Sequence, residues 1–465
     1  MNTQNDEKRK EFDALSPLEK SQVLFQQAVK HHREDKLDEA LPFYSQAIAF
    51  NPDFADAYNN MAVALRKQSR YDAALACYQK SLSIRDDHAG TYSNMGNVLN
   101  DMDRITESVA AHYKAIEHEP DNLLYIYNTA LVLRDAGKYD DAITLFNQVL
   151  AKDPAYKDCR WDRSLTYLMA GRLKEGFAEY DARWELEKSP PRKFNQPRWQ
   201  ADPLEGRTLY IHREQGFGDA IQFIRLIPEL KKRFGGSIIL ECQPELIRLF
   251  EGYDGIDQIV PFGQKPPAFD VWIPLMSLAH ILDVDIDHIP GEVPLLKPPA
   301  DGRFRVRPAP QGGANIGLVW GGSPTHKNDR RRSVELKHFL PLAGYKGVTV
   351  FSLQKGERAK ELETTGAHCL FVDAAKELKD FADTASLIHS LDLIITIDTS
   401  VAHLAGALGK ECWLMLPFTP DWRWMNERED SPWYPHMRIF RQKKPTDWEG
   451  TFKRLYHALD EKLAR

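Results

Sequence analysis

The stretch DEALPFYSQAIAFNP (residues 38–52) recurs through the first third of the chain at a step of 34 residues, the distance from Ala40 to Ala74. Each copy has a small residue, a ring four positions later, then a small or aliphatic residue and, in most copies, a proline. The four copies read Ala40, Tyr44, Ala47 and Pro52, then Ala74, Tyr78, Ser81 and Asp86, then Ser108, His112, Ala115 and Pro120, and finally Ala142, Phe146, Val149 and Pro154.

This repeat predicts pairs of antiparallel helices. The small residues let two helices approach, the ring fills the gap between them, and the proline ends the second helix. A fifth copy begins with Gly176 and Tyr180. The pattern resembles the tetratricopeptide repeat (TPR) family over residues 21–190, after a polar tail at 1–20. An unrelated helical bundle is disfavoured because bundles do not keep a constant repeat length.

The predicted array is an α-solenoid whose concave surface suits a peptide or protein partner. Asparagines recur on the first helix of several repeats. Their amides can hydrogen-bond a peptide backbone, or they can be ordinary solvated positions, and the sequence leaves both interpretations open. These residues are Asn59, Asn60, Asn94, Asn97 and Asn128.

The composition is that of a soluble globular protein, with 43% hydrophobic and 28% charged residues in a chain of 465, enough for about three domains. A net charge of −6 gives no basic footprint for DNA or RNA. The N-terminal residues lack the apolar core of a secretory signal, and no run approaches the ~18 apolar residues of a membrane span. The five cysteines lie far apart, so we expect them to be buried and reduced. A cytoplasmic location without membrane insertion is expected.

Helical periodicity ends in a proline-rich linker, predicted at residues 191–206. The next stretch, RTLYIHREQGFGDAIQFIRLIPELKKRFGGSIILECQ, reads as strand, glycine loop, helix, turn and strand, which is a βαβ unit. A second proline-rich stretch at 289–310 separates this first half (207–300) from a second half (311–465). There, short apolar runs such as ANIGLVW and LDLIITID suit a buried parallel sheet. Two such Rossmann-like halves imply a cleft lined by the carboxyl ends of their strands.

The loop EQGFGDAIQF places Asp219 near the start of a helix, directly after a strand. A carboxylate that faces a cleft from this position can accept a proton from a hydroxyl nucleophile. The alternative is an N-cap, because Asp is common where a helix begins.

The stretch TIDTSVAHLAGALGK (396–410) follows another buried strand. Thr399 and Ser400 would lie at the N-terminus of a short helix, 401–408, where free N–H groups and the helix dipole favour an anion such as phosphate. The same residues are also ordinary capping chemistry. His403 could contact phosphate or simply pack. Small residues of the helix would form a face packed closely on the sheet: Ala402, Ala405 and Gly406.

Polar and cationic groups follow several other strands of the second half, where an α/β sheet places its ligand. The polar residues of these loops are Lys327, Arg330 and Arg332 in WGGSPTHKNDRRRS, Gln354 and Lys355 in SLQKGE, and Asp421, Trp422 and Arg423 in PFTPDWRW. The charge run could also be a solvated turn. The aromatic cluster around Trp422 could stack on a base or sugar, or it could fix the C-terminal tail to the domain.

Familiar motifs of other enzyme classes are missing from the sequence. REQGFGDAIQF lacks the third glycine of a dinucleotide fingerprint, and GALGKEC lacks the spacing and the Ser/Thr of a P-loop. No HExxH, GxSxG or kinase signature occurs. DVDIDH (283–288) is a nominal DxD, but its place after SLAHIL favours a polar helix end over a metal site.

The glycine loop, the basic loop, SLQKGE and the Asp-Thr-Ser loop together resemble the GT-B glycosyltransferases related to bacterial heptosyltransferases and protein O-GlcNAc transferases. The resemblance covers about residues 206–450 and, with the TPR array, is closest to bacterial TPR-containing glycosyltransferases such as the soluble flagellin-modifying enzymes. It implies two Rossmann-like domains. It also implies metal-independent, inverting transfer from a nucleotide sugar, which is a co-substrate, with no cofactor.

The resemblance also implies roles for individual residues. Asp219 is the expected base, Asp398 is expected to bind sugar hydroxyls, and Thr399 and Ser400 to bind the phosphates. One of Lys327, Arg330 and Arg332 is expected to neutralise the leaving diphosphate. Gln354, Lys355 and His403 complete the expected donor site, and the acceptor or sugar side is expected to hold Glu214, Gln215, Gly216, Gly218 and Trp422.

Three functions follow from these features. The first is a protein glycosyltransferase whose TPR array recruits an acceptor, such as flagellin, for modification on Ser or Thr. The second is a glycan- or lipid-directed enzyme in which the array serves only assembly. The third is a non-catalytic TPR scaffold with a decayed transferase half, which the intact acidic and basic loops disfavour.

Overall fold

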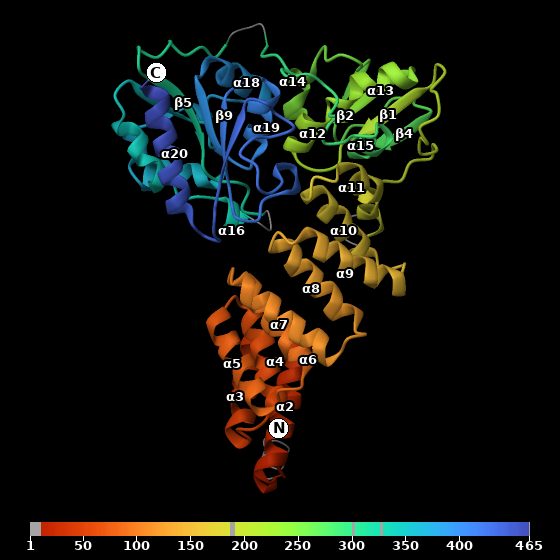
Figure 1. Ribbon diagram of the computed structural model, residues 1–465, viewed down its shortest axis with the longest axis vertical. Coiled ribbons are helices and arrows are strands. Elements are labelled where there is room, and N and C mark those ends of the chain that lie inside the picture. Colours follow the sequence, from red (N-terminus) through yellow and green to blue (C-terminus); the bar gives the residue numbers. More distant parts are fainter. Residues whose placement is uncertain (1–10, 187–190, 300–302, 326–328, 465) are drawn as a thin grey trace, which may run out of the picture. The chain divides into compact units, whose positions relative to one another are not determined.

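The computed structural model describes residues 11–186, 191–299, 303–325 and 329–464, and the chain divides into two compact units, Met1–Cys159 and Arg160–Arg465 (Figure 1).

The first unit is a series of antiparallel helix pairs. Its helices are α2 (Pro17–Arg33), α3 (Leu37–Phe50), α4 (Ala55–Lys67), α5 (Tyr71–Ile84), α6 (Ala89–Asp101), α7 (Ile105–His118), α8 (Leu123–Asp135) and α9 (Tyr139–Lys152). The repeat rings are fully buried, and so are the small residues four positions before them: Tyr44, Tyr78, His112, Phe146, Ala40, Ala74, Ser108 and Ala142. The predicted α-solenoid is confirmed, and the repeat positions form its core.

The third repeat shows why one position of each pair must be small. A Cβ atom added to Gly96 on α6 would lie 2.5 Å from Cδ2 of His112 on α7, so the histidine ring packs directly on the glycine. Ser108 Oγ donates a hydrogen bond to the carbonyl of Gly96 at 2.7 Å, which ties the helices at the same point. Burial lowers the pKa of His112 to about 4, so this ring is neutral and serves as an aromatic filler.

Some of the asparagines bond within the array. Asn59 is buried, and its Oδ1 accepts hydrogen bonds from Thr91 Oγ1 at 3.3 Å and Asn94 Nδ2 at 3.4 Å. Asn128 Nδ2 donates to Ser93 Oγ at 3.3 Å. These contacts join successive repeats, a role that sequence reasoning did not consider.

The second unit begins with the fifth helix pair, which comprises most of α10 (Lys157–Met169), α11 (Leu173–Glu179) and the 3-10 helix η1 (Tyr180–Glu185). A Cβ atom at Gly176 would lie 2.5 Å from Leu168 Cδ2, and Tyr180 is buried, as in the other repeats. Tyr180 packs against Trp422, with 6.4 Å between ring centroids. The last repeat is therefore part of the α/β unit.

The first half contains a parallel sheet in the order β3-β2-β1-β4. Its strands are β1 (Thr208–His212), β2 (Ser237–Cys242), β3 (Gln258–Pro261) and β4 (Val271–Pro274), and its main helices are α12 (Phe217–Phe223), α13 (Leu226–Phe234), α14 (Ile247–Phe250) and α15 (Leu278–Ile281). The polar DVDIDH stretch directly follows α15, in line with the helix-end interpretation.

The second half contains a six-stranded parallel sheet in the order β10-β9-β8-β5-β6-β7. Its strands are β5 (Ala314–Val319), β6 (Val348–Ser352), β7 (Val372–Asp373), β8 (Leu393–Ile397), β9 (Cys412–Leu416) and β10 (Met437–Arg441). Its helices include α16 (Asp329–Arg332), α17 (Glu361–Thr364), α18 (Phe381–Ser390), α19 (Ser400–Ala407) and α20 (Trp448–Leu463). Strands β5, β8 and β9 are buried along their whole length. The predicted α/β class with parallel sheets is confirmed.

The segment 191–206, predicted to be a linker, packs on the first sheet. The Phe194 ring lies 5.6 Å from that of Tyr210 on β1, and Trp199 is buried. Arg192 forms an ion pair with Glu241 of β2, whose side chain is fully buried. The segment contains prolines and charges, which suggested a linker, but its aromatic residues cover one face of the sheet.

The cysteine prediction is partly wrong. Cys159, Cys242 and Cys412 are buried, but Cys77 is half-buried and Cys369 is exposed on the turn after α17. All five are free thiols. Across the described ranges, no helix combines the length and the apolar character needed to cross a bilayer.

Candidate functional site

A cavity of about 830 Å³ lies at the carboxyl ends of strands from both halves. The first half contributes the loop after β1, and the second contributes the loops after β5, β6, β8 and β9. Strands β1, β5 and β8 flank the points where strand order reverses, the usual ligand position in an open α/β sheet. The predicted residues that line the cavity are Gln215, Gly216, Gly218, Asp219, Arg332, Gln354, Lys355, Asp398, Thr399, Ser400 and His403.

Asp219 caps its own helix and also faces the cavity. Its Oδ2 accepts a hydrogen bond from the Gly216 backbone N–H at 2.6 Å, which closes the first turn of α12. The two interpretations of Asp219, cap and cavity carboxylate, are therefore compatible. Burial raises the pKa of this carboxyl, and the positive charge of Arg423 opposes that rise.

Helix α12 packs against α19 of the other half through a glycine. A Cβ atom at Gly218 would lie only 2.6 Å from Cδ2 of His403, whereas one at Gly216 would meet its nearest neighbour, Asp219 Oδ2, at 3.4 Å. Gly218 thus permits the close approach that brings the Asp219 loop beside the Asp398 loop.

Arg423 connects the two halves at this point. Its guanidinium forms an ion pair with Asp219 and donates hydrogen bonds to Gln222 Oε1 at 2.7 Å and to Asp421 Oδ1 at 2.8 Å. The side chain is only 7% exposed and lies over the Trp422 ring. Asp219 and Asp421 raise the pKa of Arg423, so it remains charged despite its burial.

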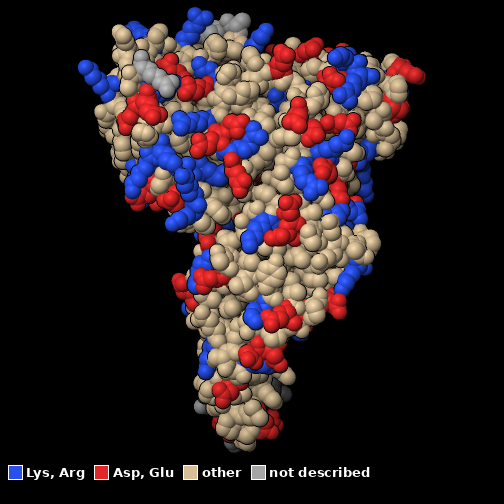
Figure 2. Space-filling view, viewed as in Figure 1, with Lys and Arg blue, Asp and Glu red and all other residues tan. Residues whose placement is uncertain are grey.

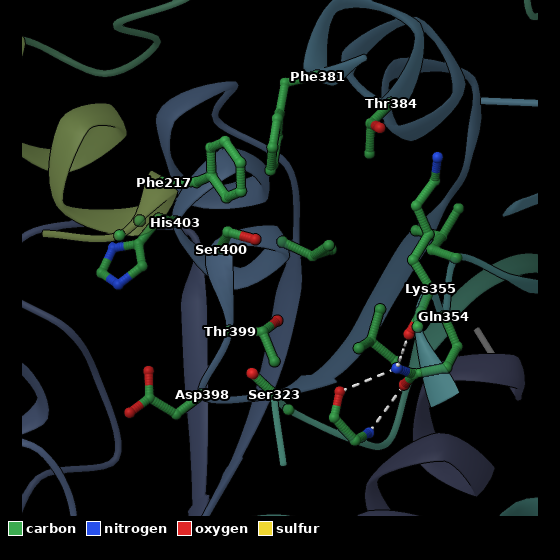
Figure 3. Close-up of a pocket in the computed structure, with 18 of the residues that line it drawn as sticks. Phe217, Ser323, Gln354, Lys355, Phe381, Thr384, Asp398, Thr399, Ser400 and His403 are labelled. Atoms are coloured by element: carbon green, nitrogen blue, oxygen red, sulfur yellow. Dashed lines mark hydrogen bonds between the residues drawn. The ribbon is translucent and has the colours of Figure 1, made fainter. Parts of the chain in front are cut away.

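The loop after β8 leads into α19 with an open N-terminus. Thr399 is the N-cap residue in extended conformation, and its side chain makes no capping hydrogen bond. The Ala402 N–H donates to the Thr399 carbonyl at 3.0 Å, whereas within the described part of the chain the N–H groups of Ser400 and Val401 make no such bond and are available to an anion. The Thr399 and Ser400 hydroxyls point into the cavity, and Asp398 lies on the same loop below His403 (Figure 3).

Asp398 is a carboxyl group with a strongly altered proton affinity. Burial, together with the nearby charge of Asp421, raises its pKa to about 6, and Arg332 acts in the opposite direction. Arg332 Nη1 also donates a hydrogen bond to the Asp398 carbonyl at 3.0 Å. At neutral pH this side chain can accept hydrogen bonds from sugar hydroxyls, and in mild acid it can donate one.

The loop after β5 is shaped by glycines and fixed by Gln354. A Cβ atom at Gly322 would lie 2.5 Å from Arg332 Nη2, so the arginine packs across the glycine backbone. Gln354 Oε1 accepts hydrogen bonds from the N–H groups of Trp320 and Gly321, and its Nε2 donates to the carbonyls of Gly321 and Lys355. Gln354 therefore lines the cavity, but both its amide oxygen and its amide nitrogen are hydrogen-bonded to backbone groups of the surrounding loops.

His403 is buried and neutral. Its Nδ1 lies 3.0 Å from Tyr434 Oη, and burial lowers its pKa to about 3. The small face of α19 was expected to pack on the sheet, but a Cβ atom at Gly406 would meet the Tyr434 ring at 2.4 Å. That glycine makes room for an aromatic ring of the segment before β10, not for the sheet.

Other predicted residues lie outside the cavity lining. Glu214 is buried in an ion pair with Arg183 of η1 and accepts a hydrogen bond from Met276 N–H at 2.8 Å. Trp422 is buried in an aromatic cluster with Phe177 and Trp433. These contacts correspond to the packing alternative for Trp422 and give Glu214 a structural role. Arg330 lies in α16 but does not line the cavity, and Lys327 lies outside the described residues.

Sequence reasoning missed several lining residues. Phe217 and Phe381 approach from opposite halves, with ring centroids 4.8 Å apart, and Thr384 follows on α18 (Figure 3). Asp421 and Arg423 also line the cavity. These two were singled out from the sequence as charged residues that follow a buried strand, but neither was assigned to the site.

Comparisons with known proteins agree with the repeat architecture. Tetratricopeptide repeat models match residues 55–88 and 127–191, and a TPR repeat model matches 31–69. Protein FlbA of Caulobacter vibrioides is 27% identical over 323 residues, which cover 64% of this chain and 54% of FlbA. The chain thus spans about half the length of this curated relative.

Solved TPR structures resemble only part of the chain. MamA from Desulfovibrio magneticus RS-1 matches 37% of it with 16% identity and a TM-score of 0.34, covering 98% of that chain. YrrB, a TPR protein with an unusual peptide-binding site, matches 36% of it with 18% identity and a TM-score of 0.32, covering 86% of that chain.

Proposed function

We propose that this protein is a metal-independent, inverting GT-B glycosyltransferase that moves a sugar from a nucleotide-sugar donor to a Ser or Thr hydroxyl of a protein. The observation that carries the proposal is the pairing in one cavity of the buried Asp219 carboxylate with the open N-terminus of α19. A base and a phosphate cradle from opposite halves are what such a displacement requires.

The proposed transfer is a single displacement at the anomeric carbon of the donor sugar. Asp219 accepts the proton of the acceptor hydroxyl, whose oxygen forms a bond to the anomeric carbon. The bond from that carbon to the donor phosphate oxygen breaks on the opposite face, and the nucleoside diphosphate leaves with the electron pair. The free N–H groups of α19 and the guanidinium of Arg332 stabilise the negative charge that develops on the phosphates.

Asp398 suits the sugar itself. It adjoins the phosphate cradle in the chain, and a carboxylate accepts hydrogen bonds from sugar hydroxyls. Its raised pKa of about 6 indicates that it is partly desolvated before any ligand arrives. The cavity lining also contains the cations Lys355, Lys379 and Arg423.

The TPR array supports a protein acceptor, such as flagellin, because stacked repeats provide an extended concave surface. Transfer to a glycan or lipid would not need this surface. Transfer of labelled sugar from a panel of nucleotide sugars to candidate proteins, followed by mass spectrometry, tests the proposal. Modification of a Ser or Thr is expected, and failure of every donor to be turned over or hydrolysed contradicts it.

The acceptor question needs a deletion that respects the compact units. Removing residues 1–159 keeps all of the fifth repeat except the first three residues of α10, and it retains the ion pair of Arg183 with Glu214. The truncated protein is expected to hydrolyse the donor slowly but to lose transfer to an intact protein. Undiminished transfer would assign the array to assembly alone.

A further inference from the structure

The surroundings of Asp219 are unfavourable for a carboxylate. Its Oδ2 is held by Gly216 N–H, and its helix is packed on α19 through the contact of Gly218 with His403. The other charged or titratable groups that face it are Arg423 and Asp421 from the loop around η8 (Trp422–Trp424), Tyr180 from η1 and Tyr434 from the segment before β10. His403 and both tyrosines are neutral, and Asp421 is a second negative charge. Arg423 is thus the positive member of the set.

Arg423 is itself fixed from three directions. It pairs with Asp219, donates to Gln222 about one turn further along α12, and donates to Asp421, two residues before it in the chain. Its guanidinium carbon lies 4.3 Å from the centroid of the Trp422 ring, which is buried. Because these contacts fix the plane of the Arg423 guanidinium, this group cannot shift with Asp219. Arg423 therefore sets the position of the carboxylate with which it pairs.

We propose that Arg423 is a positioning residue of this site, which keeps the Asp219 carboxylate ionised and sets its place opposite the α19 loop. The inference rests on the proposed function for its catalytic meaning, but its physical content does not depend on turnover. A base that is protonated at the working pH cannot accept a proton, and a buried carboxylate without a nearby cation becomes protonated.

Removal of the cation has a predictable sign. Burial raises the pKa of Asp219 and Arg423 lowers it. Arg423→Met removes the positive charge beside the carboxyl and therefore raises the pKa of Asp219 further. The acid limb of the pH profile of kcat/KM moves to higher pH by the same amount. Arg423→Lys keeps a positive charge but lacks the planar guanidinium. Its acid limb is therefore expected between those of Arg423→Met and the wild type.

Arg225 offers a matched control. It is also buried, and its guanidinium donates to the carbonyls of Pro290, Gly291 and Trp433, but it does not contact Asp219. Arg225→Met measures what the loss of a buried arginine does to folding in general. It is expected to lower the unfolding midpoint and to leave the acid limb where it is.

A readout without turnover separates this inference from the proposed function. The protonation of Asp219 is followed by infrared difference titration of the full-length protein, with the spectrum of the matching Asp219→Asn variant subtracted. The Asp219 carboxyl is expected to titrate at higher pH in Arg423→Met than in the wild type, with Arg423→Lys between them. An unchanged titration in Arg423→Met, or an equal shift in Arg225→Met, overturns the inference. A shifted titration in a protein that turns over no donor sustains the role of Arg423 and removes the proposed function.

Discussion

The loops after β1 and β8 are built alike and present opposite charge to the same cavity. Each leads from a buried strand into a short helix, α12 or α19. In α12 the third helical residue is Asp219, which accepts a hydrogen bond from Gly216 N–H and closes the helix end. In α19 the equivalent residue is Ala402, and Thr399 makes no side-chain cap.

The comparison shows that one local motif can yield a base or an anion site. Asp219 binds the N–H of Gly216 and places a negative charge at the start of α12, whereas α19 has Ala402 at the equivalent position and no carboxylate in its first turn. The start of α19 therefore favours an anion, and the start of α12 provides a base. Predictions therefore follow from exchanging these properties or from disturbing the contact between the helices.

The largest effect is expected at the carboxylate. Asp219→Asn is expected to lower kcat by roughly 10³-fold, in the usual range for loss of a general base, because an amide cannot accept the proton. Steady-state kinetics with a saturating donor measure the change. Nucleotide affinity, measured by calorimetry, should stay within about threefold. A variant that retains most of its kcat would remove Asp219 from the reaction.

The next effect is expected at the anion site. Thr399→Asp places a carboxylate at the N-cap of α19, where it accepts hydrogen bonds from the first N–H groups of the helix and repels phosphate. We expect nucleotide affinity to fall by tenfold or more while the unfolding midpoint stays the same or rises. Thr399→Ser is the control and should bind as the wild type does. If Thr399→Asp lost its fold together with its nucleotide affinity, the result would not support an anion site at the N-terminus of α19.

The contact between α12 and α19 predicts that Gly216 and Gly218 differ in how well they tolerate an added methyl group. Gly218→Ala places a methyl group 2.6 Å from His403, so we expect a destabilisation of about 1–3 kcal/mol from overpacking and reduced activity. Gly216→Ala meets its nearest atom at 3.4 Å and should cost less than 1 kcal/mol. Denaturant unfolding of both variants measures the difference, and equal losses would contradict the close packing.

The smallest effect concerns stability and pH. The folded protein raises the pKa of Asp398 from 3.8 to about 6, so it binds this proton more tightly than the unfolded chain does. Stability is therefore lost as pH rises from about 4 through 6. Asp398→Asn removes this dependence and should stabilise the protein by up to roughly 3 kcal/mol at pH 7.5, with little gain at pH 4. Calorimetric melting at both values tests the sign, and destabilisation at pH 7.5 would contradict it.

Much of this architecture could be predicted from the sequence because local signals repeat or alternate. The 34-residue phase, the distance from Ala40 to Ala74, identified the solenoid, and short apolar runs bounded by glycine identified the main strands. Loops at strand ends then placed Asp219, Thr399 and Ser400 on one cavity, because parallel strands end at the same edge.

The remaining features depend on contacts between distant residues. Arg423 and Asp219 are separated by 204 positions, and no periodicity links them. Gln354 looked like a ligand contact, but its amide is used by the loop after β5. Trp422 was a candidate sugar platform, but four other aromatic residues surround it: Phe177, Tyr180, Phe223 and Trp433. Sequence spacing indicates which loops meet, and packing decides which side chains remain free.

The central claim is that the α19 N-terminus holds the donor diphosphate opposite Asp219. Thermal melting with a panel of nucleoside diphosphates tests it most directly, because a bound ligand raises the unfolding midpoint with its concentration. We expect at least one nucleotide to raise the unfolding midpoint of the wild type and of Asp219→Asn, but not that of Thr399→Asp. A nucleotide that stabilises Thr399→Asp as strongly as the wild type, or a panel in which none stabilises the wild type, would contradict it.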